Sequence, residues 1–113
     1  MMALLLGAQA CAAGTVRADQ TAAARLVSEI LSIDGDSAYG EYLGGECVTC
    51  HQISGAASGI PPIVGHPQEY TVEALVEYKL GIRANEVMKL MTAGLTNEEI
   101  AALAAYFASI EPK

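Results

Sequence analysis

The sequence has no tryptophan and only one phenylalanine among its 113 residues. A chain of this length forms one domain, and a domain this small has a marginal core unless something adds to it. Large aromatic side chains, which contribute much of the buried area in many proteins, are too few to supply it. The composition therefore favours a small domain whose core is completed by an apolar group other than its own side chains.

Basic residues are also few, with six Lys and Arg against 13 Asp and Glu and a formal net charge of −7. Nucleic acids and anionic membrane surfaces attract basic proteins, so this balance argues against either partner. An acidic surface permits steering toward a basic patch on a partner protein, and it is equally compatible with an ordinary solvated surface.

Cysteine and histidine are scarce, yet three of these five residues stand together in Cys47-Val48-Thr49-Cys50-His51. Cys-x-x-Cys-His is the attachment signature of a c-type haem. The two thiols add across the haem vinyl groups, the two-residue gap matches the separation of those groups, and the adjacent imidazole reaches the iron. The motif predicts one covalently bound haem c, which would also supply the missing apolar surface.

Cys47 and Cys50 allow two other interpretations, a dithiol redox centre and a zinc-binding module. Zinc needs two further ligands, and the remaining candidates are His66 and Cys11. We expect Cys11 to be removed with an export signal. A thioredoxin-like dithiol is expected in an alternating β-α-β context, which the sequence does not show. The haem interpretation fits the residues better.

The N-terminus has the pattern of an export signal. An apolar run over residues 2–8 is followed by small-residue cleavage sites that end at Ala10 and Ala18. We predict cleavage after Ala18, although no basic residue precedes the apolar run. The run is too short for a permanent membrane span. Because haem attachment takes place outside the cytoplasm, the motif and the signal both predict a periplasmic location.

Periodicity predicts a helical chain without strands. We expect residues 1–18 to be the signal, 19–35 to carry an N-terminal extension helix, and 36–113 to form the haem domain. The expected helices are residues 21–33, a second from about residue 37 into the cysteines, residues 71–80, and a short ambiguous segment at 85–91. The Gly-, Pro- and Ser-rich stretch 54–67 is expected to be loop.

The last helix has the clearest signature. Thr96 is a candidate N-cap, and Glu99 completes a capping box three residues later. Apolar residues then follow at helical spacing until Pro112 closes the segment, namely Ile100, Leu103, Ala104 and Phe107.

An iron held by His51 on one side has two candidate soft ligands for the other, Met88 and Met91. A thioether stabilises ferrous over ferric iron, which raises the reduction potential and suits electron transfer. It also fills the sixth coordination position, which discourages oxygen chemistry. The two methionines are three residues apart, so on a helix they share a face and one of them can simply be a packing residue.

The series of motifs resembles a small class I c-type cytochrome. After Cys-x-x-Cys-His come Pro61-Pro62-Ile63-Val64-Gly65, Tyr70, a helix that ends in Tyr78-Lys79-Leu80-Gly81-Ile82-Arg83, a methionine segment and the last helix. Over residues 36–110 the chain is most similar to the bacterial group that holds the cytochrome subunit of flavocytochrome c sulfide dehydrogenase and related dihaem cytochromes of high potential. The resemblance implies an all-α class I cytochrome c fold, with helices wrapped around one haem.

The resemblance also assigns residues to roles. The methionine ligand of this group stands seven residues before the position of Leu95, which selects Met88 and leaves Met91 to packing. Pro61 matches the proline whose carbonyl holds the axial histidine through its other ring nitrogen, with Pro62 as the weaker alternative. Gly40 matches the small residue at which the first helix of the domain crosses the last.

Tyr70 and Arg83 match positions that bind haem propionates in the group. The planar fork of an arginine suits a carboxylate, although a solvated surface arginine is the alternative. His66 stands where the group often has glutamine, and an iron with His51 and His66 as its two ligands is a weaker alternative to the His51 and Met88 pair.

These features predict a periplasmic electron-transfer protein rather than an enzyme. The resemblance implies a redox partner, either a flavoprotein or molybdenum dehydrogenase of sulfur compounds, a terminal oxidase or another cytochrome. The sequence does not distinguish a free carrier from a bound subunit.

Overall fold

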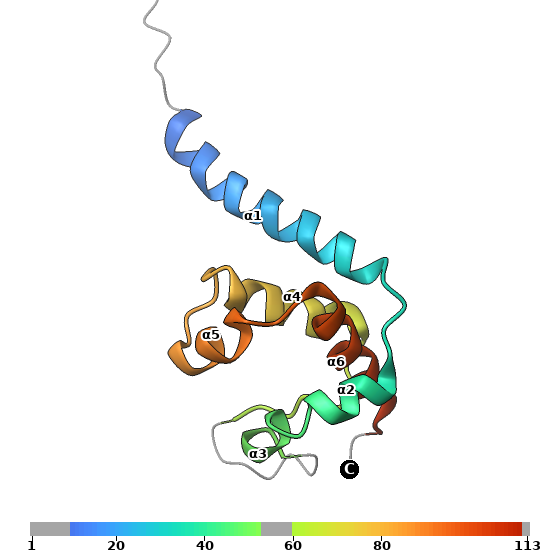
Figure 1. Ribbon diagram of the computed structural model, residues 1–113. Helices are drawn as coiled ribbons and strands as arrows, with labels where there is room; N and C mark the ends of the chain where they lie inside the picture. The colour runs from blue at the N-terminus through green and yellow to red at the C-terminus, as the bar shows by residue number, and fades with distance from the viewer. Residues whose placement is uncertain (1–9, 53–59, 112–113) are drawn as a thin grey trace, which may run out of the picture.

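The computed structural model describes residues 10–52 and 60–111 of the chain. Within these residues it contains helices and no strand, which confirms the all-α prediction (Figure 1). The helices are α1 (Ala10–Leu31), α2 (Ser37–Leu43), α3 (Cys47–Cys50), α4 (Gln68–Lys79), α5 (Glu86–Ala93) and α6 (Asn97–Ser109).

Helix α6 lies at the centre of the domain. Its capping box is present as predicted, because the Thr96 hydroxyl accepts from the Glu99 backbone N–H at 3.2 Å and the Glu99 carboxylate accepts from the Thr96 N–H at 2.9 Å. Its buried side chains enter two apolar clusters, one shared with α1 and α4 and the other with the α2–α3 region and the segment around Val64. The apolar residues that the helical spacing predicts are divided between them, with Ile100 and Ala104 in the first cluster and Leu103 and Phe107 in the second.

Helices α2 and α6 cross at Gly40, as the resemblance predicts. A Cβ atom on Gly40 would overlap the carbonyl oxygen of Ala102 and lie 2.7 Å from the Cβ of Tyr106. The N-terminus of α2 is capped by Asp36, whose carboxylate accepts from the backbone N–H groups of Ala38 and Tyr39. The expected helix into the cysteines is interrupted, because α2 ends at Leu43 and α3 begins at Cys47, after the Gly44-Gly45 pair.

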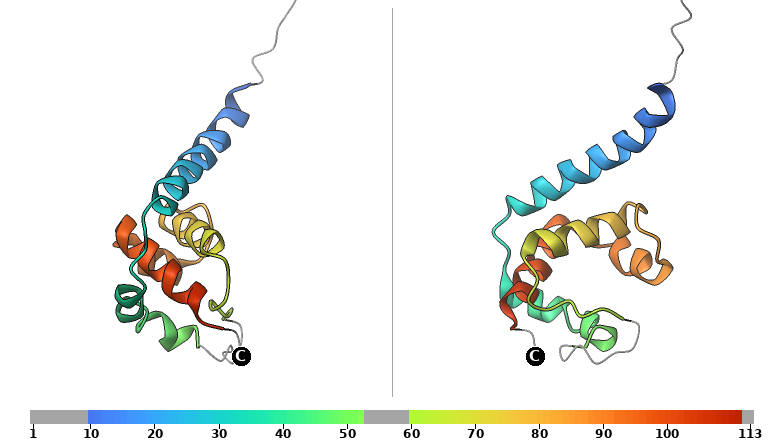
Figure 2. Two further views of the ribbon diagram at one scale, coloured as in Figure 1. Left: turned by 90° about the vertical axis from the view of Figure 1, so that its right-hand side faces the viewer. Right: turned by 180° about the vertical axis from the view of Figure 1, so that it is seen from behind.

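Helix α1 begins at Ala10, well before the predicted start at residue 21, and therefore continues through the predicted cleavage position after Ala18. Its contacts with the core come later, from Ala23 and Ile30 with Leu26 and Val27 beside them. These residues pack on α4 and α6, while the first part of α1 extends away from the other helices (Figures 1 and 2). The core contacts of α1 that the structure describes come from residues that follow position 18.

Helices α4 and α5 form an adjacent pair joined by a short connection. The predicted helix 71–80 starts earlier, at Gln68, and the ambiguous segment 85–91 is helical with Asn85 as its N-cap. Lys79, at the end of α4, donates through Nζ to the carbonyl oxygens of Leu95 at 2.5 Å and Ala93 at 3.3 Å. This side chain fixes the end of α4 against the turn between α5 and α6.

The predicted loop 54–67 is described only from residue 60, and residues 60–67 form no helix or strand. Residues 2–8 of the predicted signal and Pro112 lie outside the described part of the chain. Among the helices that the structure describes, none combines the length and the apolar character needed to cross a membrane.

Candidate functional site

The two cysteines of the motif occupy the ends of the single-turn helix α3. Cys47 and Cys50 are three residues apart, so their side chains project from neighbouring positions on one side of this turn. Neither is in a disulfide; Cys50 is exposed and Cys47 is half-buried beside Leu103 and Phe107. Burial raises the pKa of the Cys47 thiol, and the charge of Glu46 adds to the shift. Two unpaired thiols are thus available for one ligand.

His51 follows directly as the C-terminal cap of α3, and the carbonyl of Pro61 fixes its ring. The Nδ1 atom of His51 is 2.7 Å from Pro61 O, which is the contact that the sequence predicts. A carbonyl oxygen can only accept, so Nδ1 carries the proton and Nε2 keeps a lone pair. The alternative acceptor, Pro62 O, lies instead 3.2 Å from Nε2 of His66.

The segment that carries Pro61 is anchored on α6. Val64 is buried against Leu103 and Phe107, and the N–H of Gly65 donates to the carbonyl of Phe107 at 2.9 Å. Gly65 has a φ of +76°, a conformation that glycine adopts without steric cost. These contacts hold the proline segment in place relative to the last helix.

The two candidate methionines lie on α5 in different environments. Met88 is half-buried, whereas Met91 is 42% exposed. The Asn85 side chain accepts from the backbone N–H of Met88 at 2.9 Å, which fixes the first turn of α5 at this residue. Helices α3 and α5 lie on the same side of the α2–α6 crossing (Figures 1 and 2). The motif and the methionine helix therefore lie on the same side of the molecule.

An apolar stripe on α5 is left uncovered beside Met88. Val87 is 65% exposed and Leu90 is 78% exposed, and Met91 continues the stripe at helical spacing. Exposed apolar side chains at adjacent positions of one short helix are typical of a surface that packs against another apolar group.

The structure does not bring Tyr70 and Arg83 together. Tyr70 is in the first turn of α4, and Arg83 follows the end of that helix, so about 14 Å of helix axis separates Tyr70 from the last residue of α4. The Arg83 guanidinium pairs with Glu77 at 2.7 Å and lies over the ring of Tyr78, 5.3 Å from its centroid. Tyr70 is 52% exposed and packs beside His66.

One contact that sequence reasoning misses involves His66, which the sequence predicts only as a loop residue or a weak alternative ligand. Its ring bonds to Pro62 O and lies 4.5 Å from the ring of Tyr70, centroid to centroid. His66 therefore contacts both the proline segment and the first turn of α4. Residues 60–67 form no helix, so the spacing of Pro62 and His66 in the sequence gives no signal for this contact.

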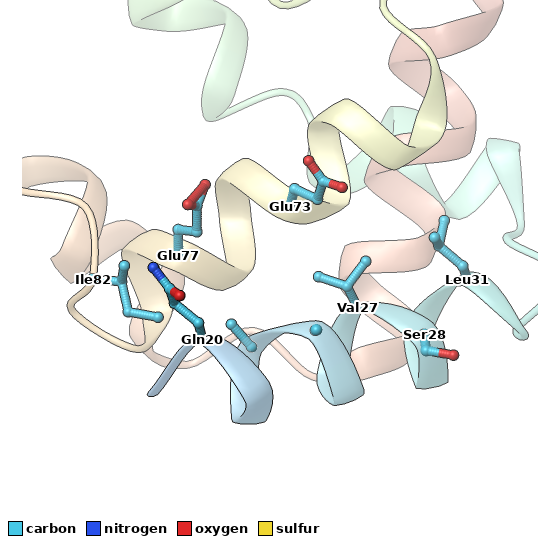
Figure 3. Close-up of a pocket in the computed structure, with 9 residues that line it drawn as sticks. Gln20, Val27, Ser28, Leu31, Glu73, Glu77 and Ile82 are labelled. Carbon is cyan, nitrogen blue, oxygen red and sulfur yellow. The ribbon is translucent and has the colours of Figure 1, made fainter. Parts of the chain in front are cut away.

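A groove between α1 and α4 holds none of the predicted site residues (Figure 3). Val27 and Leu31 project into it from α1, and Glu73 and Glu77 border it from α4. In the described parts of the chain no three His, Cys, Asp or Glu side chains are grouped as a metal ion would require.

Residues 35–111 match the family model for cytochrome c. The chain belongs to the cytochrome c family. A domain of this family binds haem c covalently, so the helical fold, the thiol pair and the oriented imidazole have one explanation. The predicted class I cytochrome c fold is confirmed, and the dithiol and zinc interpretations lose their support.

Named relatives agree with this assignment. The cytochrome subunit of sulfide dehydrogenase from Chlorobaculum tepidum is 40% identical over 75 residues, which cover 66% of this chain and 68% of the relative. Cytochrome c-554(548) from Halomonas halodenitrificans is 38% identical over 82 residues, which cover 68% of this chain and 99% of the relative. These are electron-transfer proteins and not catalytic enzymes, and this cytochrome transfers electrons as they do.

A third relative is longer. The thiosulfate dehydrogenase electron acceptor from Thiomonas intermedia is 33% identical over 69 residues, which cover 58% of this chain and 32% of the relative. The cytochrome thus spans about a third of that protein.

Proposed function

We propose that this cytochrome carries single electrons through one haem, with His51 and Met88 as the axial ligands, and that it serves a dehydrogenase of sulfur compounds as acceptor or subunit in the periplasm. The observation that carries the proposal is the hydrogen bond from His51 Nδ1–H to Pro61 O, next to two unpaired thiols. It leaves the other imidazole nitrogen ready for iron.

The thiols and the imidazole act as one attachment unit. Cys47 and Cys50 would hold the haem through two thioethers, and His51, which directly follows α3, would bind the iron from the same segment. The bound haem supplies an iron that cycles between ferric and ferrous states. The bond to Pro61 keeps the imidazole in one tautomer and one orientation, which limits the rearrangement that accompanies each electron transfer.

Met88 is the better candidate for the opposite side of the iron. It is less exposed than Met91, and its helix is fixed at this residue by the Asn85 cap. A thioether ligand favours the ferrous state and closes the iron to dioxygen and peroxide. These properties suit a carrier that holds an electron and passes it on unchanged.

The names of the relatives support the choice of partner. One is the cytochrome subunit of a sulfide dehydrogenase and another is the electron acceptor of a thiosulfate dehydrogenase. The formal charge of −7 favours encounter with a partner that offers a basic patch near its own redox centre. We infer a flavoprotein or molybdenum dehydrogenase as the electron donor, with a terminal oxidase or a second cytochrome as the acceptor.

Export is part of the same proposal. Thioether formation requires the haem and the chain to meet outside the cytoplasm, and residues 1–18 have the composition of a signal. Cleavage after Ala18 would leave the core contacts of α1 intact, because Ala23 and Ile30 come later in the chain.

A spectrum and a reduction assay test the proposal. The chain, expressed with haem maturation in a bacterial periplasm, should show the Soret and α bands of a low-spin c haem. It should be reduced in a salt-dependent manner by a sulfide or thiosulfate dehydrogenase and its substrate, because screening weakens the attraction of an acidic carrier. Haem-loaded protein that neither enzyme reduces would overturn the choice of partner. Protein without haem absorption would overturn the proposal that the chain binds haem.

A further inference from the structure

We propose that His66 is a positioning residue for the axial histidine, acting through the Pro61-Pro62 pair, a role that rests on the proposed binding of haem by His51. The carbonyls of these consecutive prolines bond to two different imidazoles. Pro61 O accepts from His51 Nδ1 at 2.7 Å, and Pro62 O accepts from His66 Nε2 at 3.2 Å. The second bond fixes the peptide next to the one that orients the iron ligand.

The proline pair makes this control effective. Each proline ring locks φ near −65°, so the direction of each carbonyl depends on the single remaining torsion ψ. Neither proline has an N–H, so the pair cannot be held by donating backbone bonds of its own. Pro62 also confines ψ of Pro61 to the extended region, so the bonds that the two carbonyls accept select their orientation within a narrow range.

His66 is itself held firmly enough to act as an anchor. The preceding residue, Gly65, is tied to α6 by its bond to Phe107 O at 2.9 Å. On its other side the His66 ring packs against Tyr70 of α4, with centroids 4.5 Å apart and planes inclined by 34°. These contacts connect α6 and α4 to His66, and hydrogen bonds then connect His66 to Pro62 and Pro61 to His51.

The bond between His51 and Pro61 would influence the reduction potential of the bound iron. A strong bond to the Nδ1 proton increases the basicity of the ligating nitrogen, which stabilises ferric iron and lowers the reduction potential. If His66 no longer holds Pro62, the Pro61 carbonyl gains freedom and its bond to His51 weakens. The reduction potential should then rise, and the Nδ1 proton of His51 should exchange faster with solvent.

Two substitutions separate the hydrogen bond from the packing. His66→Phe keeps an aromatic ring beside Tyr70 and removes the donor, whereas His66→Gln keeps an N–H donor and removes the ring. Gln68→Phe, at an exposed position two residues further on, is the matched control for a new apolar side chain. Each full-length, haem-loaded protein is compared with the wild type by potentiometric titration and by NMR exchange of the His51 Nδ1 proton in the ferrous, diamagnetic state.

We expect His66→Phe to raise the potential and to accelerate the exchange at least severalfold, while His66→Gln and Gln68→Phe stay close to the wild type. Wild-type potential and exchange in His66→Phe would overturn the inference, and so would equal changes in His66→Phe and His66→Gln. A wild-type chain without haem absorption would instead overturn the proposed function, so the two failures are distinguishable.

Discussion

Gly40 in α2 packs directly on Ala102 in α6, with no room for a methyl group between the two helices. Gly40→Ala must force the helices apart, and we expect it to lower the free energy of unfolding by about 2–3 kcal/mol. The measurement is guanidinium chloride unfolding of the haem-loaded protein. Gly94→Ala is the matched control, because a Cβ there meets nothing within 4 Å and the backbone has a φ of −95°. It should change stability by less than about 1 kcal/mol. Equal effects at the two positions would contradict the close crossing.

Ile30 tests whether α1 belongs to the core of the domain. Its side chain is fully buried among residues of α4 and α6, so Ile30→Ala should cost about 3 kcal/mol of unfolding free energy. The neighbouring Leu31 is 38% exposed, and Leu31→Ala should cost less than about 1 kcal/mol. Thermal or denaturant unfolding of both variants gives the comparison. If Ile30→Ala behaves like Leu31→Ala, then α1 is only a tether.

The capping box of α6 should contribute measurably to stability. Thr96→Ala removes the acceptor for the Glu99 N–H and should cost about 1 kcal/mol, the usual value for an N-cap. Thr21→Ala, on the exposed surface of α1, is the control and should be nearly neutral. A negligible loss in Thr96→Ala, measured by denaturant unfolding at pH 7, would show that tertiary contacts alone hold the end of the helix.

The same box makes part of the stability depend on pH. The bond from the Thr96 backbone N–H lowers the pKa of Glu99 below its ordinary value of 4.5, so folding favours the ionised carboxylate. This contribution is present above the unfolded-state pKa and is lost as the pH falls through the lower folded-state pKa. Glu99→Ala should therefore lose less stability than the wild type between pH 5 and pH 3. Glu98→Ala, which removes a carboxylate of the same helical turn and leaves the bonded Glu99 in place, is the control.

Met88 and Met91 form a matched pair for the ligand assignment. Met88→Ala should abolish the far-red sulfur-to-iron band of the ferric protein and lower the reduction potential, because a thioether stabilises ferrous iron. Met91→Ala removes a similar side chain at the next turn and should keep both properties. The measurements are the ferric absorption spectrum and a potentiometric titration. The reverse pattern would move the ligand to Met91, and no change in either variant would remove methionine from the iron.

Local patterns predicted the fold well where a few neighbouring residues decide the structure. Thr96 and Glu99 form a capping box through contacts within one turn. The crossing at Gly40 joins residues far apart in the sequence, and it was the family resemblance that predicted it. The predicted start of α1 at residue 21 is wrong, because the helix begins at Ala10. The alanine-rich segment before residue 21 has a high helix propensity but no amphipathic pattern that would predict a helix there. The break between α2 and α3 falls at Gly44 and Gly45, because glycine is a poor residue for the interior of a helix.

The sequence and the resemblance indicate the candidate site residues and the contact of His51 with Pro61, but not the contacts of His66 and Arg83. Cys47, Cys50 and His51 are adjacent in sequence, and family resemblance supplied Pro61 and Met88. The bond of His66 to Pro62 depends on how Gly65 is anchored to α6, which no local pattern records. The pairing of Arg83 with Glu77 likewise depends on the turn after α4, and it leaves the predicted contacts of Arg83 and Tyr70 with haem carboxylates as predictions.

The most direct test of the account is the intact mass of the exported protein under denaturing conditions, measured for the wild type and for the Cys47→Ser/Cys50→Ser double variant. We predict that the wild-type chain retains the mass of one haem after unfolding, and that the double variant loses it, because thioethers survive conditions that release a coordinated haem. A wild-type mass equal to that of the bare polypeptide would contradict the account.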